Sequence, residues 1–195
     1  VDHRGRRRTK LTYPKGPAND TPDPKGPMPT TIRNQLWDGI AVLSDPSRMG
    51  KQYLRRFPDD DSLQAELDYL RLRRELLLLL LESVGRRPGE LARARVRKTR
   101  ELSYRKLWLP TLKKRKLRDP EGPVPLGGGA DIKLRVFIEK HRAALIDRLR
   151  AAGVKPAPND CIFLCSRKGT PLSERSLTKE FQRIAAAAGV NQRAC

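Results

Sequence analysis

Most of the residues with potential for phosphate chemistry lie between positions 86 and 118. These 33 residues include fourteen Lys and Arg side chains but only two acids, Glu90 and Glu101. A guanidinium group can hold two phosphate oxygens at once, whereas an ammonium group binds them as a point charge. A run of cations often marks only a solvated face, but this one is interleaved with predicted strands. The segment therefore favours contact with a nucleic-acid backbone.

Arg87 stands at an unusual position within GRRPGEL, residues 85–91. Pro88, followed two residues later by Glu90, predicts that a helix begins here. Arg87 is then a poor N-cap, because Ser, Thr, Asp or Asn would be better by roughly 1 kcal/mol. Since local rules are often broken at functional sites, we expect the guanidinium and the helix N–H groups to converge on an anion. The alternative is that Arg86 and Arg87 simply extend into water.

An apolar helix is expected to precede this helix start. Asp61 or Ser62 is the expected N-cap of a helix over residues 62–84. This helix becomes apolar on every side at Leu76–Leu81, which predicts that it is buried on every side. The run is much shorter than the roughly 20 apolar residues of a membrane span. Gly85 is expected to end the helix.

A basic hairpin is expected to follow it. Residues 88–96 are expected to form a helix, and the alternating side chains of residues 102–109 predict a strand. A second short strand, PVPL at 123–126, returns after a basic connector. Lys and Arg side chains in a hairpin beside a helix N-terminus form a natural phosphate cradle. The connector contains Lys113, Lys114, Arg115 and Lys116.

The remaining pattern predicts three further helices and one strand. The helices cover residues 30–43, residues 132–152 with Asp131 as N-cap, and residues 174–188 with Ser173 as N-cap. CIFLC at 161–165 is expected to be a buried strand. The predicted fold class is α+β, mainly helical with a small three-stranded antiparallel sheet. Residues 1–30 are expected to be an extended, basic, proline-rich linker or tail, and residues 31–195 a domain.

Composition narrows the class of partner. The chain has 195 residues, with 42 Lys and Arg against 22 Asp and Glu, a formal charge of +20 and a pI near 10.7. This excess favours a polyanion, nucleic acid first and an anionic membrane surface second. The membrane alternative lacks an amphipathic helix with a basic face and bulky aromatics. The three cysteines form neither a disulfide framework nor a zinc pattern. A cytoplasmic location is expected, because the sequence shows no membrane-span or signal-peptide pattern.

Three blocks of the sequence resemble the tyrosine recombinases, the phage-integrase family. VGRRPGELARARV resembles the first box of that family, with Gly85, Arg87, Glu90 and Leu91 on its pattern and Val84 in place of the usual Thr. TLKKRKLRDPEGPVPL resembles the β-hairpin that carries the catalytic lysine. IFLCSRKGTPLSERSLTKEFQRIAAAAGV resembles the strand, turn and helix before the second box. The resemblance covers residues 60–193 and implies the DNA breaking-rejoining catalytic fold.

The resemblance also implies a reaction and a set of roles. Such enzymes cleave and rejoin DNA through a 3′-phosphotyrosine, without a metal or another cofactor. Arg87 would be a clamp on the scissile phosphate and Glu90 its supporting carboxylate. Lys113 matches the catalytic lysine best, with Lys114 and Lys116 as alternatives. Arg86, Lys114, Arg115, Lys116 and Arg175 are the remaining candidate DNA contacts.

The family's second box, His-x-x-Arg, and its nucleophilic tyrosine have no counterpart in this sequence. His3 and the helical His141, expected to be exposed, lie elsewhere, and no tyrosine can be assigned as nucleophile. We therefore expect an incomplete catalytic domain that binds double-stranded DNA, self-associates on it and does not cleave it. The parent would be a bacterial, nucleoid-associated recombinase of a mobile element, with no membrane partner and no small-molecule substrate. The alternative is a non-catalytic DNA- or RNA-binding protein that uses the same hairpin and helix start.

Overall fold

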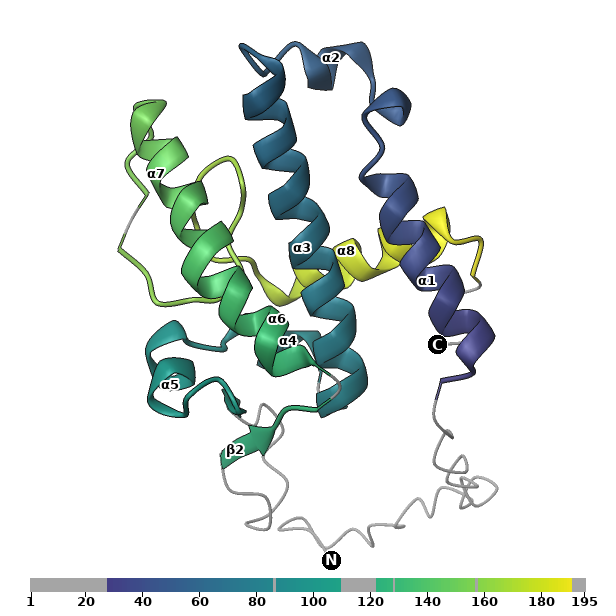
Figure 1. Ribbon diagram of the computed structural model, residues 1–195, viewed down its shortest axis with the longest axis vertical. Helices are drawn as coiled ribbons and strands as arrows, with labels where there is room; N and C mark the ends of the chain where they lie inside the picture. The colour runs from purple at the N-terminus through teal and green to yellow at the C-terminus, as the bar shows by residue number, and fades with distance from the viewer. Residues whose placement is uncertain (1–27, 86, 110–121, 128, 157, 191–195) are drawn as a thin grey trace, which may run out of the picture.

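The run of six leucines lies inside the long helix at the centre of the molecule (Figure 1). The computed structural model describes residues 28–85, 87–109, 122–127, 129–156 and 158–190. Within them, helix α3 spans Asp60–Val84. Leu76, Leu77 and Leu80 are fully buried in the main core, while Leu78 is buried in a second cluster with helices α1 and α8. Two cores on opposite sides of one helix explain why the helix needs apolar residues all round.

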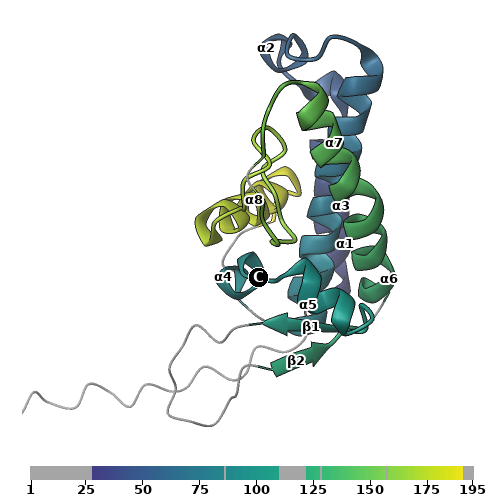
Figure 2. The same ribbon diagram turned by 90° about the vertical axis from the view of Figure 1, so that its left-hand side faces the viewer.

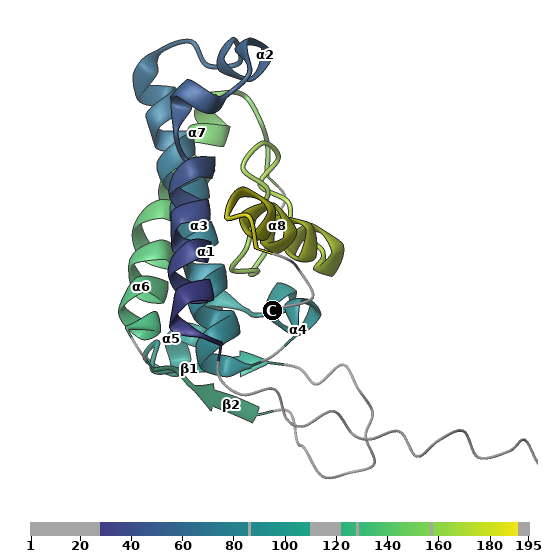
Figure 3. The same ribbon diagram turned by 90° about the vertical axis from the view of Figure 1, so that its right-hand side faces the viewer.

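The other elements surround α3. Helices α1 and α8 lie on one side of it, α6, η2 and α7 on another, and the hairpin lies near its C-terminal end (Figures 1, 2 and 3). The helical elements are α1 (Thr30–Leu43), η1 (Pro46–Arg48), α2 (Lys51–Leu54), α4 (Pro88–Ala92), α5 (Val96–Glu101), α6 (Ala130–Val136), η2 (Phe137–Arg142, a π-helix), α7 (Ala143–Ala151) and α8 (Glu174–Ala187). The strands are β1 (Lys106–Leu109) and β2 (Gly122–Pro125).

The predicted mainly helical α+β class is confirmed, but the described sheet has two strands. Strands β1 and β2 pair antiparallel, with Leu107 opposite Val124 and Leu109 opposite Gly122. The predicted third strand at 161–165 is wrong. This buried segment forms single bridges, from Cys161 to Arg95 and from Leu164 to Pro171, instead of joining the hairpin.

The same segment explains why the predicted helix over 88–96 is divided. The Ile162 N–H donates to the Ala94 carbonyl at 3.2 Å, and the Val96 N–H donates to the Asp160 carbonyl at 2.7 Å. The Ala94 carbonyl and the Val96 N–H therefore pair with residues 160 and 162, and they are not available for hydrogen bonds along a helix. Helix α4 ends at Ala92, and α5 begins at Val96.

Two consecutive non-glycine residues shorten the predicted strand over 102–109. Ser103 and Tyr104 have positive φ angles of 52° and 62°. The Tyr104 N–H donates to the Thr99 carbonyl at 3.0 Å, so this turn closes the end of α5. A left-handed backbone is uncommon for residues with a Cβ and cannot continue a strand. Strand β1 therefore begins only at Lys106.

The helix caps agree with the sequence in part. Ser173 caps α8 as predicted and accepts from the Ser176 N–H at 3.2 Å. For α3 the predicted caps are wrong, because the Asp59 carboxylate accepts from the Ser62 N–H at 2.6 Å. For α6 the N-cap is Gly129 with φ 79°, and Asp131 lies in the first turn, near the positive end of the helix dipole.

Candidate nucleic-acid interface

Helix α4 begins as the sequence predicts. Gly85 ends α3 with φ 60°, Arg87 is extended with φ −73° and ψ 149°, and Pro88 opens the helix. The Arg87 backbone N–H donates to Glu90 Oε2 at 3.2 Å. The Glu90 carboxylate is buried, with 5% of the residue exposed, whereas the Arg87 side chain is exposed. Glu90 thus fixes the backbone of Arg87 and leaves its guanidinium facing solvent.

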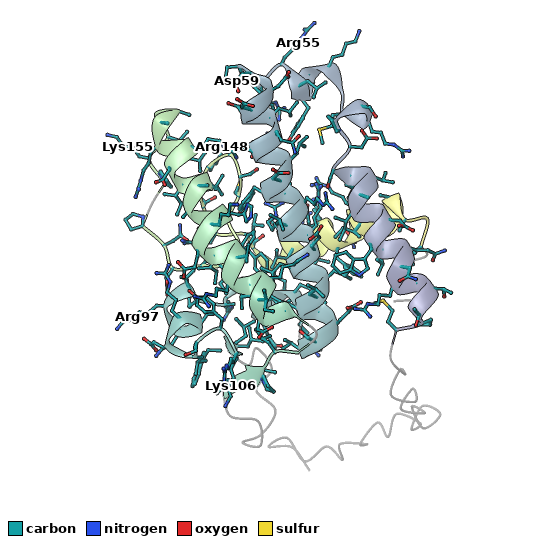
Figure 4. The ribbon with its side chains drawn as sticks, in the orientation of Figure 1. Arg55, Asp59, Arg97, Lys106, Arg148 and Lys155 are labelled. Carbon is teal, nitrogen blue, oxygen red and sulfur yellow. The ribbon has the colours of Figure 1, made fainter. Side chains whose placement is uncertain are left out.

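Exposed cations flank α4 at Arg87 and Arg93 and continue through α5 to the first residue of β1. Figure 4 shows Arg97 and Lys106 at the end of the molecule that holds the hairpin, and Arg55 at the opposite end. Between residues 87 and 106, every described Lys and Arg is exposed. We call this set the basic surface; it consists of Arg87, Arg93, Arg95, Arg97, Lys98, Arg100, Arg105 and Lys106.

Carboxylates neutralise only part of the basic surface. Glu101 binds Arg97 at 3.2 Å and Lys98 at 3.1 Å, and the hydrogen bond from Lys98 is the main reason that the pKa of Glu101 is lowered. Within the described part of the chain, Arg93, Arg105 and Lys106 form no ion pair. The residual charge is positive and open to solvent, which suits the phosphates of a nucleic acid.

Glu139 connects α5 to the π-helix η2. Arg100 donates to its two carboxylate oxygens, from Nε at 2.9 Å and from Nη2 at 2.9 Å. The Tyr104 hydroxyl donates to the same carboxylate. These bonds, from Arg100 first and then from Tyr104, lower the pKa of Glu139. The contact fixes the turn that leads into β1, and no spacing in the sequence indicates it, because 35 residues separate Tyr104 from Glu139.

The structure brings together only some of the predicted site residues. Arg175 is exposed in the first turn of α8, and α8 packs against α4, the helix that begins after Arg87. The other predicted cations lie outside the described residues; they are Arg86, Lys113, Lys114, Arg115 and Lys116. The juxtaposition of Arg87 with a hairpin lysine therefore stays a prediction.

None of the three described tyrosines has an exposed hydroxyl positioned as a free nucleophile. Tyr69 is buried and donates to the Leu164 carbonyl at 2.9 Å, and burial raises its pKa to about 12. Tyr104 binds Glu139. The Tyr53 hydroxyl is buried. His141, expected to be exposed, is half-buried instead, and burial is the main reason that its pKa is lowered.

Sequence reasoning missed a buried cluster of charges between α3 and α8. Arg74 Nε lies 2.7 Å from Glu180 Oε1, and Arg73 Nη2 lies 3.2 Å from the same oxygen. Burial alone would raise the pKa of Glu180, but the two guanidinium groups outweigh it and lower the pKa. The available signal was position, because Arg73 and Arg74 lie just before the leucine run, in the part of α3 that was predicted to be buried.

Comparison with known proteins adds no identity. The chain matches no family model, and no curated protein matches it. No helix among the described residues is long and apolar enough to cross a membrane.

Proposed function

We propose that this chain binds the phosphate backbone of double-stranded DNA through the basic surface and the start of α4. The observation that carries the proposal is the pair formed by Arg87 and Glu90. A buried carboxylate holds the backbone of Arg87 at 3.2 Å, while the guanidinium stays exposed at a helix start. Such an arrangement suits a phosphate, which can accept from a guanidinium fork.

We further propose that the chain is part of a tyrosine-type, site-specific DNA recombinase. The support is the order of the three resembling blocks, together with the described hairpin that follows α4 and α5. In such an enzyme Arg87 would bind a non-bridging oxygen of the scissile phosphate and stabilise its developing charge. A lysine between β1 and β2 would protonate the leaving 5′ oxygen. Arg175, exposed on α8, would be a further contact to DNA.

The binding proposal is tested by titrating a labelled DNA duplex with the protein at several salt concentrations and following fluorescence anisotropy. Removing one cation that binds a phosphate should reduce the slope of log affinity against log salt by about 0.9. We expect this reduction for Arg93→Ala and Lys106→Ala, because both cations are exposed and without ion pairs among the described residues.

Matched controls come from the opposite end of the molecule. Arg55→Ala and Lys155→Ala remove the same side-chain types from exposed positions. Figure 4 shows both residues far from Lys106 and Arg97. If all four variants lowered the slope equally, binding would reflect net charge alone, and the assignment of the basic surface would fail.

The recombinase proposal needs a different readout. A duplex with a nick near the cleavage site traps a covalent protein–DNA adduct when the attacking residue is present. In a protein that forms this adduct and contains this chain, Arg87→Ala should abolish the adduct, while duplex affinity should fall by no more than the loss of one phosphate contact. An unchanged yield of adduct would remove Arg87 from the reaction.

A further inference from the structure

Two adjoining cavities border α3 between Ser62 and Arg74, away from its C-terminal end. The first, of about 670 Å³, is bordered by α2, α3, α8 and the turn at 165–168. The second, of about 410 Å³, is bordered by α2, the end of α7 and the same turn. They share four lining residues, Tyr53, Glu66, Ser166 and Arg167. Each volume lies in the range of ligand pockets, about 300–1,000 Å³.

The first cavity carries an excess of positive charge. Six of its lining residues are cations, Arg73, Arg74, Arg167, Lys168, Lys179 and Arg183, and two are acids, Glu66 and Glu180. Both acids are already engaged, Glu180 by Arg73 and Arg74, and Glu66 by Arg148. Figure 4 shows Arg148 on α7, on the side toward α3.

Three of these cations are not neutralised by any carboxylate in the described part of the chain. Arg167, Lys168 and Lys179 are exposed and form no ion pair with any described residue. They come from the turn at 165–168 and from α8, so they converge on the cavity from two separate elements. A phosphate or carboxylate is the group that such a set would recognise.

Two buried polar atoms beside the first cavity have no hydrogen-bond partner in the described structure. One is the Tyr53 hydroxyl and the other is Arg73 Nε. Arg73 is only 6% exposed, and its other nitrogens bind the Leu164 carbonyl at 3.1 Å and Glu180 at 3.2 Å. Buried polar atoms are nearly always paired, so each exception points to a missing partner.

The second cavity is lined mainly by apolar groups. Phe57, Pro58, Leu149, Ala152 and Val154 border it. The Tyr53 and Phe57 rings lie 5.4 Å apart, centroid to centroid, at an angle of 55°. A flat, apolar body fits this environment, because aromatic rings pair at such distances and tilts.

We propose that the two cavities together bind an organic phosphate. Its phosphoryl group occupies the cationic cavity near Arg167, Lys168 and Lys179, and its ring lies against Phe57 in the apolar cavity. Tyr53 lines both cavities, and its hydroxyl, which has no partner among the described residues, is a donor at their boundary. Burial, followed by the charge of Glu66, raises the pKa of Tyr53, so the hydroxyl stays a donor at neutral pH. None of the residues that line these cavities belongs to the basic surface, although Lys179 lies one turn after Arg175 on α8.

A nucleoside monophosphate is the probe that combines both features. In calorimetric titrations of the whole chain, adenosine 5′-monophosphate should bind saturably. Adenosine, which lacks the phosphate, and inorganic phosphate, which lacks the ring, should each bind at least about tenfold more weakly. The proposal is overturned if adenosine or inorganic phosphate binds as tightly as the monophosphate. It is also overturned if the monophosphate does not bind saturably.

Variants locate the two halves of the site. Lys168→Ala should weaken the monophosphate about tenfold, and Phe57→Leu about threefold to tenfold. Lys155→Ala is the control, because Lys155 is an exposed lysine that lines neither cavity. Circular dichroism confirms that each variant is folded. Unchanged binding by folded Lys168→Ala and Phe57→Leu places the ligand elsewhere and overturns the proposal.

Competition with duplex DNA identifies the source of the phosphate. If the free organic phosphate is the ligand, saturating duplex leaves its affinity unchanged. If a DNA phosphate occupies the same cations, duplex displaces the monophosphate, and Lys168→Ala weakens both while Phe57→Leu weakens only the monophosphate. If Lys168→Ala loses monophosphate binding but keeps the wild-type slope of log DNA affinity against log salt, this site is separate from the proposed DNA interface.

Discussion

Arginines occur in two opposite environments in this molecule. In the basic surface, Arg93 and Arg105 are exposed and have no ion pair among the described residues. Between α3 and α8, Arg73 and Arg74 are 6% and 7% exposed and share the carboxylate of Glu180. No described carboxylate pairs with the first set, whereas Glu180 pairs with both arginines of the second. The comparison separates charge that is left exposed on the surface from charge that the fold itself must satisfy.

The largest effect should come from removing the buried partner. Glu180→Ala leaves two guanidinium groups buried without their carboxylate, and breaking a buried pair in this way costs about 3–5 kcal/mol. The free energy of unfolding, measured with urea, reports the loss. Glu101→Ala is the matched control in the basic surface and should change it by less than about 0.5 kcal/mol. Equal losses in the free energy of unfolding for Glu180→Ala and Glu101→Ala would contradict the distinction between the two regions.

Acid should weaken the same contact. Because the pKa of Glu180 is lower in the folded protein, its contribution to stability is present above the unfolded pKa, near 4.5. That contribution is lost as the pH falls through the folded pKa below that value. Urea unfolding at a series of pH values should show wild type and Glu180→Gln converging under acid conditions. If the difference in the free energy of unfolding between wild type and Glu180→Gln stayed constant down to the lowest pH, the stabilising role of the Glu180 carboxylate would be contradicted.

A helix cap gives a smaller, independent effect. Ser173→Ala removes the acceptor for the Ser176 N–H at the start of α8, so the free energy of unfolding should fall by about 1 kcal/mol. Ser173→Asp restores an acceptor and should recover the stability. If Ser173→Ala also reduced DNA affinity, while Ser173→Asp did not restore it, the start of α8 would belong to the binding surface.

The smallest effect on stability should come from the basic surface itself. Arg93→Ala removes an exposed side chain without a described ion pair, so the free energy of unfolding should change by less than about 0.5 kcal/mol. Urea unfolding of the same variant that is used in the DNA titration measures this free energy. A larger loss of stability would show that Arg93 supports the fold.

Local patterns predicted the features that depend on neighbouring residues. Periodicity and capping alone predicted the helix over 30–43, the buried leucines of α3, the left-handed Gly85, the Ser173 cap and the start of α4 at Pro88. Six consecutive leucines cover every face of a helix, so the leucine run predicted that the core surrounds this part of α3.

Features that depend on distant residues could not be predicted in this way. The division between α4 and α5 follows from hydrogen bonds to residues 160–162. The missing third strand has the same cause, since CIFLC satisfies its backbone against Arg95 and Pro171. The pairing of Arg100 with Glu139 joins positions 39 residues apart. Local spacing carries no information about such contacts.

The π-helical turn at Phe137–Arg142 absorbs one residue more than ordinary helical winding would. The helical chain from α6 to α7 is wound more loosely here, and Leu134, Phe137 and Leu145 all face the core. An α-helix turns by about 100° per residue, so ordinary winding over the same number of residues would rotate α7 by about 100° relative to α6. Leu145 would then leave the interior. Deleting one residue from this turn should therefore disturb the core less than deleting one residue from α7, because the wider turn can relax to ordinary winding.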